Sequence, residues 1–336
     1  MKHILVLLPN WIGDAAMCTP ALRILAKRYP DAEITVAGRS AICALLEGLP
    51  YIKRCVDLPA RPGLGAMRKL GQTLRPYARN LCVVFPHSSR AAILARLTGA
   101  HQRLGYARGN RSWLLTDTVE PHRVDGDIVP IYMAHEYEQL VLSLGCEVDN
   151  LGLELAADAG ECAAVQARVG AGGPLVGVAP GAAFGPSKCW LPERYAEVIN
   201  RLHHDHGARC VLLTGPGEEA TRQAVLDRVE VPLLECQSTP PTLARLKAII
   251  ASLDLFMGND SGPRHIAIAF KKPVICIMGS TSPAYTTSPW EQGEVLRIDV
   301  DCGPCQKPVC ETDHRCMSGI TVAHVVMAAQ KHLPRI

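Results

Sequence analysis

Short apolar runs alternate with amphipathic stretches along the whole chain. The first run covers residues 4–8, a polar turn follows at 9–14, and residues 15–29 have a helical periodicity that ends before Pro30. Apolar runs of strand length between amphipathic helices are typical of a parallel sheet with helices on both faces. The start of the chain therefore predicts a strand, a loop and a helix of a doubly wound α/β fold.

The same alternation occurs in two consecutive halves. For the first half we predict further strands at 33–37, 51–58, 81–85 and 101–106, and a helix at 131–144. For the second half we predict strands at 175–179, 208–214, 231–234, 253–257 and 273–278, and helices at 192–206, 218–229, 242–251 and 261–270. Two doubly wound parallel sheets follow from this pattern.

Length and composition also favour two domains. The chain has 336 residues, 48% hydrophobic and 20% charged, which exceeds the roughly 100–200 residues of one common domain. Residues 156–174 lose the periodic pattern, so we predict the linker there. We expect one Rossmann-like domain over 1–165 and a second over 172–336, with a terminal helix that could return to the first. Because open α/β sheets bind ligands beyond the carboxyl ends of their strands, we expect the domains to face each other across a cleft.

The cysteine content is high for a protein of this composition. The first apolar run, residues 4–8, is too short for a signal peptide or a spanning helix, so we expect a cytoplasmic location. In that reducing compartment the 14 Cys should be mostly core residues or metal ligands, not crosslinks. Cys82, Cys210 and Cys276 lie in apolar strand runs and are predicted core residues.

The net charge of +3 hides an uneven distribution. Residues 53–111 contain twelve Lys or Arg against one acid, Asp57, a local net charge of +11. One interpretation is a set of solvated helix faces whose Arg stems cover apolar surface. The other is a field that attracts a phosphorylated substrate, an acidic lipid surface or a nucleic acid. Nucleic acid is the least favoured, because few aromatics lie among the cations and no nucleic-acid-binding motif accompanies them.

The loop after the first strand carries a carboxylate. Asn10, Trp11 and Gly13 precede Asp14, which comes at the start of the following helix. A carboxylate at the positive end of a helix dipole stays ionised and is held at the carboxyl end of the sheet. A simple N-cap role for Asp14 is equally compatible with the sequence.

Two loops of the second half suit an anion. Residues 179–190 combine glycine backbone amides with one cation, Lys188, as a phosphate or diphosphate site requires, although an ordinary loop is the alternative. In the later loop, Ser261 and Gly262 begin a helix and present unpaired amides. His265 lies one turn further on the same face as Ser261, although a lone histidine is more often a packed core residue.

A third loop of this half resembles a dinucleotide fingerprint. Residues 215–220 match the form G-x-G-x-x-A, and Glu235 lies 20 residues after the first glycine, where a ribose-binding acid would fall. The match supports a nucleotide in the second half. A nucleotide-dependent oxidoreductase is the alternative from another enzyme class. It is disfavoured because the first strand leads to Asn10 and not to a glycine fingerprint.

Three long runs occur in the order that one enzyme family has them: LPNWIGDAAMCTPALRIL, APGAAFGPSKCWLPERYAEV and MGNDSGPRHIAIAFKKPVICIMGSTSPAYTTSP. They resemble the ADP-heptose:lipopolysaccharide heptosyltransferases, inverting glycosyltransferases of family 9 with a GT-B fold. The runs GPSKCW and STSPAY are most similar to the heptosyltransferases II, which add the second heptose. The resemblance implies transfer of L-glycero-D-manno-heptose from ADP-heptose to the first heptose of the inner core (heptosyl-Kdo2-lipid A), without a metal or redox cofactor for the chemistry. A related transferase with another heptose acceptor is the alternative.

The resemblance also implies roles for individual residues. The N-terminal domain would bind the acceptor, with Asp14 as general base and Asn10, Trp11 and Gly13 beside it. The C-terminal domain would bind ADP-heptose, with either Glu218 or Glu219 at the ribose. The expected donor-binding residues are Gly181, Ser187, Lys188, Gly215, Glu218, Glu219, Asp260, Ser261, Gly262 and His265. The basic stretch would then attract the anionic inner face of the inner membrane, where we expect a peripheral enzyme.

The densest cysteine cluster lies near the C-terminus. Cys302, Cys305, Cys310 and Cys316 have the spacing C-x2-C-x4-C-x5-C. This spacing allows a tetrahedral structural zinc site that takes no part in catalysis. Reduced thiols that pack a loop, or a disulfide, are the alternatives.

Overall fold

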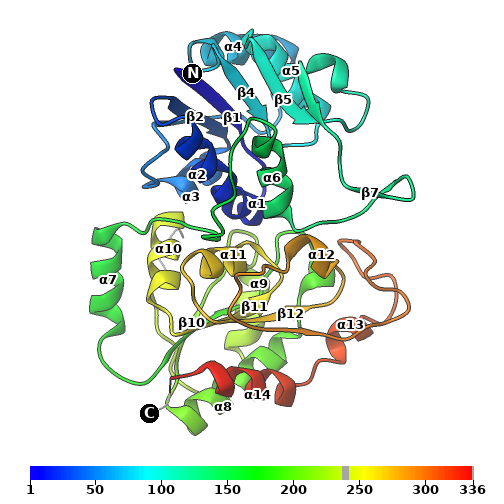
Figure 1. The fold of residues 1–336 in the computed structure, drawn as a ribbon. Helices are drawn as coiled ribbons and strands as arrows, with labels where there is room; N and C mark the ends of the chain where they lie inside the picture. The colour runs from blue at the N-terminus through cyan, green and yellow to red at the C-terminus, as the bar shows by residue number, and fades with distance from the viewer. Residues whose placement is uncertain (237–241, 335–336) are drawn as a thin grey trace. The chain divides into compact units, whose positions relative to one another are not determined.

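The computed structural model describes residues 1–236 and 242–334 and forms two compact units, Met1–Ala156 and Ala157–Ile336 (Figure 1). Each unit is a parallel β-sheet covered by helices on both faces, which confirms the predicted fold class. The described residues, 1–236 and 242–334, include no helix that is long and apolar enough to span a membrane.

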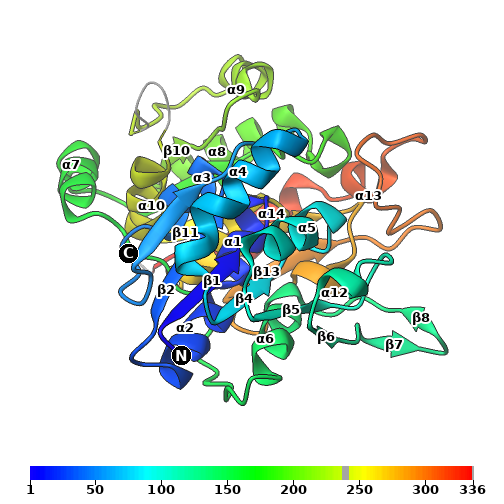
Figure 2. The same cartoon turned by 90° about the horizontal axis from the view of Figure 1, so that it is seen from above.

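The first unit has a six-stranded sheet in the order β3-β2-β1-β4-β5-β6, with all neighbours parallel. The strands are β1 (His3–Leu7), β2 (Glu33–Gly38), β3 (Arg54–Asp57), β4 (Leu81–Val84), β5 (Gln102–Tyr106) and β6 (Asp117–Val119). The helices are α1 (Ile12–Met17), α2 (Thr19–Arg28), α3 (Ser40–Leu46), α4 (Leu64–Leu74), α5 (Ser89–Thr98) and α6 (Met133–Leu142). Figure 2 shows the small hairpin of β7 (Arg123–Val124) and β8 (Asp127–Ile128) projecting beyond β6.

The first helix differs from the expectation at both ends. We predicted a single helix over residues 15–29. Instead, α1 begins at Ile12, and the helix is interrupted at Cys18 before α2 begins. Pro20 lies in the first turn of α2, where its missing N–H is tolerated. Trp11 is the N-cap residue of α1, so Asp14 lies inside the first turn. The N-cap interpretation of Asp14 is therefore wrong.

The second unit has a five-stranded parallel sheet in the order β10-β9-β11-β12-β13. The strands are β9 (Leu175–Ala179), β10 (Arg209–Leu212), β11 (Leu255–Asn259), β12 (Val274–Met278) and β13 (Gly293–Arg297). The helices are α7 (Ala159–Val169), α8 (Pro192–His206), α9 (Glu219–Leu226), α10 (Leu243–Ser252), α11 (Gly262–Ala269), α12 (Pro283–Thr286), α13 (Arg315–Ser318) and α14 (Val322–His332). The strand predicted at 231–234 is wrong, because only Leu233 forms an isolated bridge to Cys210.

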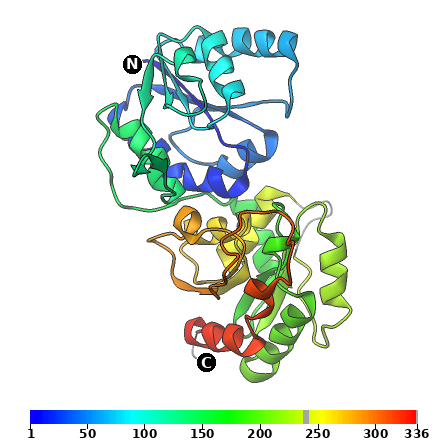
Figure 3. The ribbon, with the colours of Figure 1, turned by 90° about the vertical axis from the view of Figure 1, so that its right-hand side faces the viewer.

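The boundary between the two units, at Ala156 and Ala157, lies within the predicted linker at 156–174, but most of that stretch is the helix α7 (Ala159–Val169) and not an irregular segment. The Asp158 side chain caps this helix by accepting a hydrogen bond from the Glu161 amide at 2.9 Å. Val165 and Val169 are buried where α7 packs against α10. The terminal helix α14 packs on α8 and β13 of the second unit (Figure 3).

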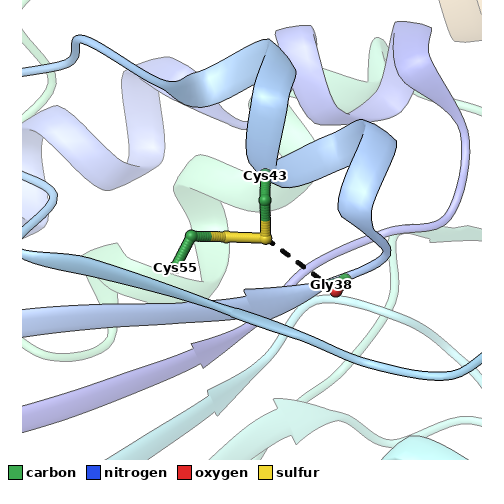
Figure 4. Close-up of a disulfide and its surroundings, with 3 residues drawn as sticks. All are labelled: Gly38, Cys43 and Cys55. Atoms are coloured by element: carbon green, nitrogen blue, oxygen red, sulfur yellow. Dashed lines mark hydrogen bonds between the residues drawn. A yellow bond between two sulfur atoms is a disulfide. The ribbon is translucent and has the colours of Figure 1, made fainter.

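One crosslink departs from the expectation that the cysteines are mostly core residues or metal ligands. Cys43 on α3 and Cys55 on β3 form a disulfide with a Cα–Cα distance of 5.6 Å (Figure 4). Helix α3 packs directly on β3, which brings the two side chains together. The Cys43 sulfur lies 3.9 Å from the Gly38 carbonyl oxygen. Because a disulfide sulfur has no proton to donate, this is a close contact and not a hydrogen bond.

Candidate functional site

In the first unit, polar residues follow three neighbouring strands of the sheet. Asn10 and Asp14 follow β1, His87 follows β4, and Arg108 follows β5. The carboxyl ends of parallel strands lie at one edge of the sheet, where such folds bind ligands. Of these residues, His87 was not identified from the sequence, and Arg108 was recognised only as part of the basic stretch.

Helix α6 adds a buried carboxylate to this edge. Glu136 is 2% exposed, and its Oε1 lies 3.0 Å from His87 Nε2 and 3.2 Å from Arg108 Nη2. Arg108 Nη1 lies 3.1 Å from His87 Nδ1. Because a guanidinium only donates, His87 Nδ1 accepts, and the ring proton is on Nε2, facing Glu136. Arg108 Nε is buried and has no hydrogen-bond partner among the described residues, so the cluster has a donor left for a ligand.

Asp14 lies near this cluster. Helix α1, which carries Asp14, packs against α6. Burial raises the pKa of Tyr137 on α6, and the charges of both Asp14 and Glu136 raise it further. Trp11 has 54% of its surface exposed, and Gly13 is half-buried. A half-buried carboxylate three residues after an exposed aromatic side chain suits a ligand with hydroxyl groups and apolar faces, such as a sugar.

In the second unit, Lys188 is held by Asp260. Lys188 ends the short 3-10 turn that follows β9, and its Nζ lies 2.9 Å from both Oδ2 and the carbonyl oxygen of Asp260. Asp260 Oδ2 also accepts from Thr281 Oγ1 at 2.7 Å, and Oδ1 accepts from Arg264 at 2.8 Å. Burial raises the pKa of Asp260, but the charges of Arg264 and Lys188 outweigh it and hold the pKa well below the usual range. Asp260 is thus saturated by protein partners and positions Lys188.

A second buried pair completes the charge balance. Arg264 is fully buried and forms a bidentate ion pair with Glu291, with Nε–Oε1 and Nη2–Oε2 distances of 2.7 and 2.6 Å. The two cations, Lys188 and Arg264, are thereby matched by Asp260 and Glu291. Sequence reasoning missed Arg264 and Glu291. The i, i+4 spacing of Asp260 and Arg264, across the start of α11, was the available signal for the first.

The start of α11 carries polar atoms without protein partners. Among buried side-chain atoms of the described residues, Ser261 Oγ and His265 Nδ1 have no hydrogen-bond partner. Burial, with the charge of Arg264, lowers the pKa of His265 to about 3, so its ring is neutral at physiological pH. Gly262 opens the helix, and its amide is one of those that a helix leaves unpaired. This end of α11 can therefore donate hydrogen bonds to an anion, but His265 supplies no charge.

The loops after β9 and β10 meet at Glu218. Its Oε2 accepts from the Gly215 amide at 2.8 Å, and a Cβ at residue 181 would lie 2.1 Å from Glu218 Cδ. Glu219 is exposed and accepts from the Gly217 amide at 3.2 Å. Of the two glutamates, Glu218 is the one that faces the loop after β9. It also occupies the Gly215 amide, which a dinucleotide fingerprint would offer to a pyrophosphate. The exposed Glu235 pairs with Arg222 at 3.2 Å.

Asn259, which the sequence reasoning missed, ties the same loops together. It is fully buried at the end of β11, and its Nδ2 donates to the Pro180 carbonyl oxygen at 2.7 Å. Its Oδ1 accepts from the Trp190 amide at 3.1 Å and from the Tyr195 hydroxyl at 2.8 Å. The loops on both sides of Lys188 are therefore fixed to the strand that leads into Asp260.

The four C-terminal cysteines are not gathered into a group of metal ligands. Over residues 1–236 and 242–334, no group of three His, Cys, Asp or Glu side chains is placed to hold a metal ion. Cys316 packs into the core of the second unit, whereas Cys302 is exposed. All four thiols instead line one cavity of about 230 Å³, together with Ser187 and His314.

The chain is similar to several known heptosyltransferases. A family model described as glycosyltransferase family 9 (heptosyltransferase) matches residues 67–315. Lipopolysaccharide heptosyltransferase 2 of Escherichia coli K12 is 28% identical over 88% of each chain, and lipopolysaccharide heptosyltransferase 3 of the same strain is 26% identical over 96% of this chain and 95% of its own. The solved structure of E. coli ADP-heptose lps heptosyltransferase II superposes with a TM-score of 0.82 at 26% identity over 98% of both chains. A glycosyltransferase family 9 protein of Veillonella parvula superposes with a TM-score of 0.87 at 22% identity, over 98% of this chain and 96% of its own.

Proposed function

Because the chain belongs to glycosyltransferase family 9, the heptosyltransferases, we propose that it transfers L-glycero-D-manno-heptose from ADP-heptose to a heptose of the lipopolysaccharide inner core. The names of its relatives support both substrates, since they include lipopolysaccharide heptosyltransferases and an ADP-heptose-dependent enzyme. Membership of a transferase family also disfavours the oxidoreductase alternative.

The second unit binds the donor in this proposal. The observation that carries it is Lys188, held by Asp260 beside the start of α11. As the bond from the sugar to the diphosphate breaks, negative charge grows on the leaving ADP. The Lys188 ammonium and the amides at Ser261 and Gly262 stabilise that charge. Glu218 is the proposed partner of the ribose hydroxyls.

The first unit binds the acceptor. Asp14 takes the proton of the acceptor hydroxyl, whose oxygen attacks the anomeric carbon on the face opposite ADP and inverts its configuration. Asn10, Trp11 and Gly13 surround the acceptor sugar. Arg108 and His87, oriented by Glu136, bind its polar groups. No step of this displacement calls for a metal, and activity in excess chelator is the check.

Heptosyl-Kdo2-lipid A is the proposed acceptor, with addition of the second heptose. The similarity to lipopolysaccharide heptosyltransferase 2 supports this choice. The similarity to lipopolysaccharide heptosyltransferase 3 makes a later heptose the alternative acceptor.

We also propose a peripheral position on the anionic cytoplasmic face of the inner membrane. Nine of the twelve cations between residues 53 and 111 are exposed, and only Arg103, Arg108 and Arg111 are partly or fully buried. Exposed cations in this number attract an anionic lipid surface.

A single assay tests donor, acceptor and reaction. The protein is incubated with ADP-heptose and mono-heptosylated Kdo2-lipid A, and ADP release is measured with the mass of the lipid. We expect ADP release with addition of one heptose to this acceptor. Modification of only a more extended core would replace the proposed acceptor by the alternative. Tight binding of NADH without binding of ADP would overturn the transferase mechanism.

A further inference from the structure

The cysteine-rich segment 301–316 holds the residue that precedes Lys188. The Ser187 amide donates to the Pro308 carbonyl oxygen at 3.1 Å, and Ser187 Oγ donates to the Lys307 carbonyl oxygen at 2.5 Å. On the other side, His314 Nε2 lies 2.9 Å from the Ser187 carbonyl oxygen. Every polar group of Ser187 is thus bonded to this segment, so its conformation sets the position of Lys188.

The segment 301–316 packs closely against the residues around Ser187. A Cβ at residue 185 would lie 2.3 Å from the Pro308 carbonyl oxygen, so the two backbones touch. The Gln306 amide donates to the Ser280 carbonyl oxygen at 2.9 Å, and Ser280 Oγ lies 3.1 Å from Ser187 Oγ, which can accept its proton. Closely packed backbones transmit a displacement instead of absorbing it.

Two thiols of the segment share one hydroxyl group. The sulfur atoms of Cys302 and Cys310 lie 4.0 and 3.5 Å from Thr312 Oγ1. Cys302 is exposed and Cys310 is half-buried, and both line the cavity of about 230 Å³. Thiols that are accessible and lie near each other are the kind that react with external disulfides.

We propose that Cys302 and Cys310 form a redox-sensitive dithiol, and that its oxidation by a low-molecular-weight disulfide weakens donor binding. The effect on the donor rests on the function proposed above. The Cys310 thiolate attacks one sulfur of the external disulfide and releases one thiolate. Cys302 loses its proton, attacks the Cys310 sulfur of the mixed disulfide and releases the second thiol. Two protein thiols are oxidised, and one external disulfide is reduced to two thiols.

The position of the Cys302–Cys310 disulfide in the chain explains its effect on donor binding. Lys307 and Pro308, whose carbonyl groups hold Ser187, lie inside the loop that a Cys302–Cys310 disulfide closes. A disulfide requires an S–S distance of about 2.05 Å. The two sulfurs, which are not bonded now, must therefore move toward each other, and their contacts with Thr312 Oγ1 change. The carbonyl groups move with the loop, and Lys188 moves with Ser187.

The test uses the full chain, purified in reductant and then treated with oxidised glutathione. Peptide mapping should find Cys302 joined to Cys310, and calorimetry should find ADP bound about tenfold more weakly, within the usual range of coupling between two sites. Reductant should restore the affinity. Cys302→Ser should bind ADP normally and lose the response. Cys162→Ser, a half-buried cysteine on α7 outside the cluster, should keep it.

Four results would overturn the proposal. The first three are a peptide map without the Cys302–Cys310 link, linked protein with unchanged ADP affinity, and a response that persists in Cys302→Ser. Purified protein that retains one metal ion per chain, lost in Cys302→Ser, would also overturn it, because the thiols would then be occupied. The peptide map does not depend on the enzyme's activity. If reduced protein binds no ADP, it is the proposed function that fails, and the dithiol is judged by the map alone.

Discussion

The carboxylate of Glu218 fills the space that a side chain on Gly181 would need. A Cβ at residue 181 would lie 2.1 Å from Glu218 Cδ and 2.3 Å from each carboxylate oxygen. The glutamate also caps the Gly215 amide, so the loops after β9 and β10 form one surface. Burial raises the pKa of Glu218, as expected for a carboxylate packed against backbone with few polar neighbours.

Gly181→Ala should therefore impair donor binding. The added methyl group would displace Glu218 from both loops, and we expect the Kd for ADP to rise about tenfold, as loss of one charge-assisted hydrogen bond would give. Isothermal titration calorimetry with ADP measures this Kd. Gly65→Ala is the matched control, because nothing lies within 4 Å of a Cβ there. An unchanged Kd in Gly181→Ala would remove Glu218 from the donor site.

Lys188→Met and Asp260→Asn should separate binding from stability. Lys188→Met leaves Asp260 paired with Arg264, so we expect weak ADP binding with a small loss of stability. Asp260→Asn leaves the half-buried Lys188 beside an amide and removes one partner of the fully buried Arg264, and breaking a buried charge pair costs about 3–5 kcal/mol. Denaturant unfolding and ADP titration measure the two effects.

The double variant distinguishes the two roles that Lys188 could have. If the lysine binds diphosphate, Lys188→Met/Asp260→Asn should regain part of the stability lost in Asp260→Asn and still bind ADP weakly. Normal ADP binding by the double variant would mean that Lys188 serves only to neutralise Asp260.

Asp14→Asn should abolish catalysis and spare donor binding. A general base contributes about 10²–10⁴ to the rate, so kcat should fall by that factor while the Kd for ADP stays the same. Heptose transfer followed by mass spectrometry measures the first, and calorimetry the second. Loss of ADP binding in a folded Asp14→Asn protein would contradict the assignment of donor and acceptor to separate units.

Arg108→Met should act on the acceptor alone. It removes the guanidinium that lies beside His87 and Glu136, so we expect the KM for the acceptor to rise about tenfold, with the KM for ADP-heptose unchanged. Arg96→Met, an exposed cation of the same basic stretch, is the control for a purely long-range charge effect. Equal increases in the two variants would assign the effect to the field and not to the site.

The extent to which the sequence predicts the fold depends on burial. Strand β9 (Leu175–Ala179) is buried at every position, and its continuous apolar run was predicted with the right bounds. Strand β13 is an edge strand and half-buried throughout, so its residues GEVLR carry no such signal. Helix α7 was missed because its narrow apolar stripe, Val165 and Val169, lies beside a glycine-rich end that dominated the pattern.

The candidate site was predictable where it follows from position along the chain. Asp14, Lys188 and Ser261 were found because they follow strands, at the edge where such folds bind ligands. Their roles stay predictions. Glu136 and Glu291 were not found, because each acts through partners far away in sequence, His87 and Arg264. Only the packing of helices and loops on the sheet brings those charges together.

Glu138 should make the stability of the protein depend on pH. It is 3% exposed on α6, and its Oε1 is buried without a hydrogen-bond partner among the described residues. Burial, with the charge of Asp149, raises its pKa from 4.5 to about 7. Between these values the folded protein binds a proton that the unfolded chain has released. Stability therefore falls as pH rises from 4.5 to about 7 and then levels off.

Glu138→Gln should remove this dependence, because the amide stays neutral. We expect the variant to be more stable above pH 7 by up to about 3 kcal/mol and to lose the slope below it. Denaturant unfolding at a series of pH values measures both, with the exposed Glu147→Gln as control. The buried pair of Arg23 and Asp149 does not mask the effect. Asp149 has its pKa lowered by its hydrogen bond to Arg23, so its contribution is lost only as pH falls below 3.8. A slope that persists in Glu138→Gln would place the titrating group elsewhere.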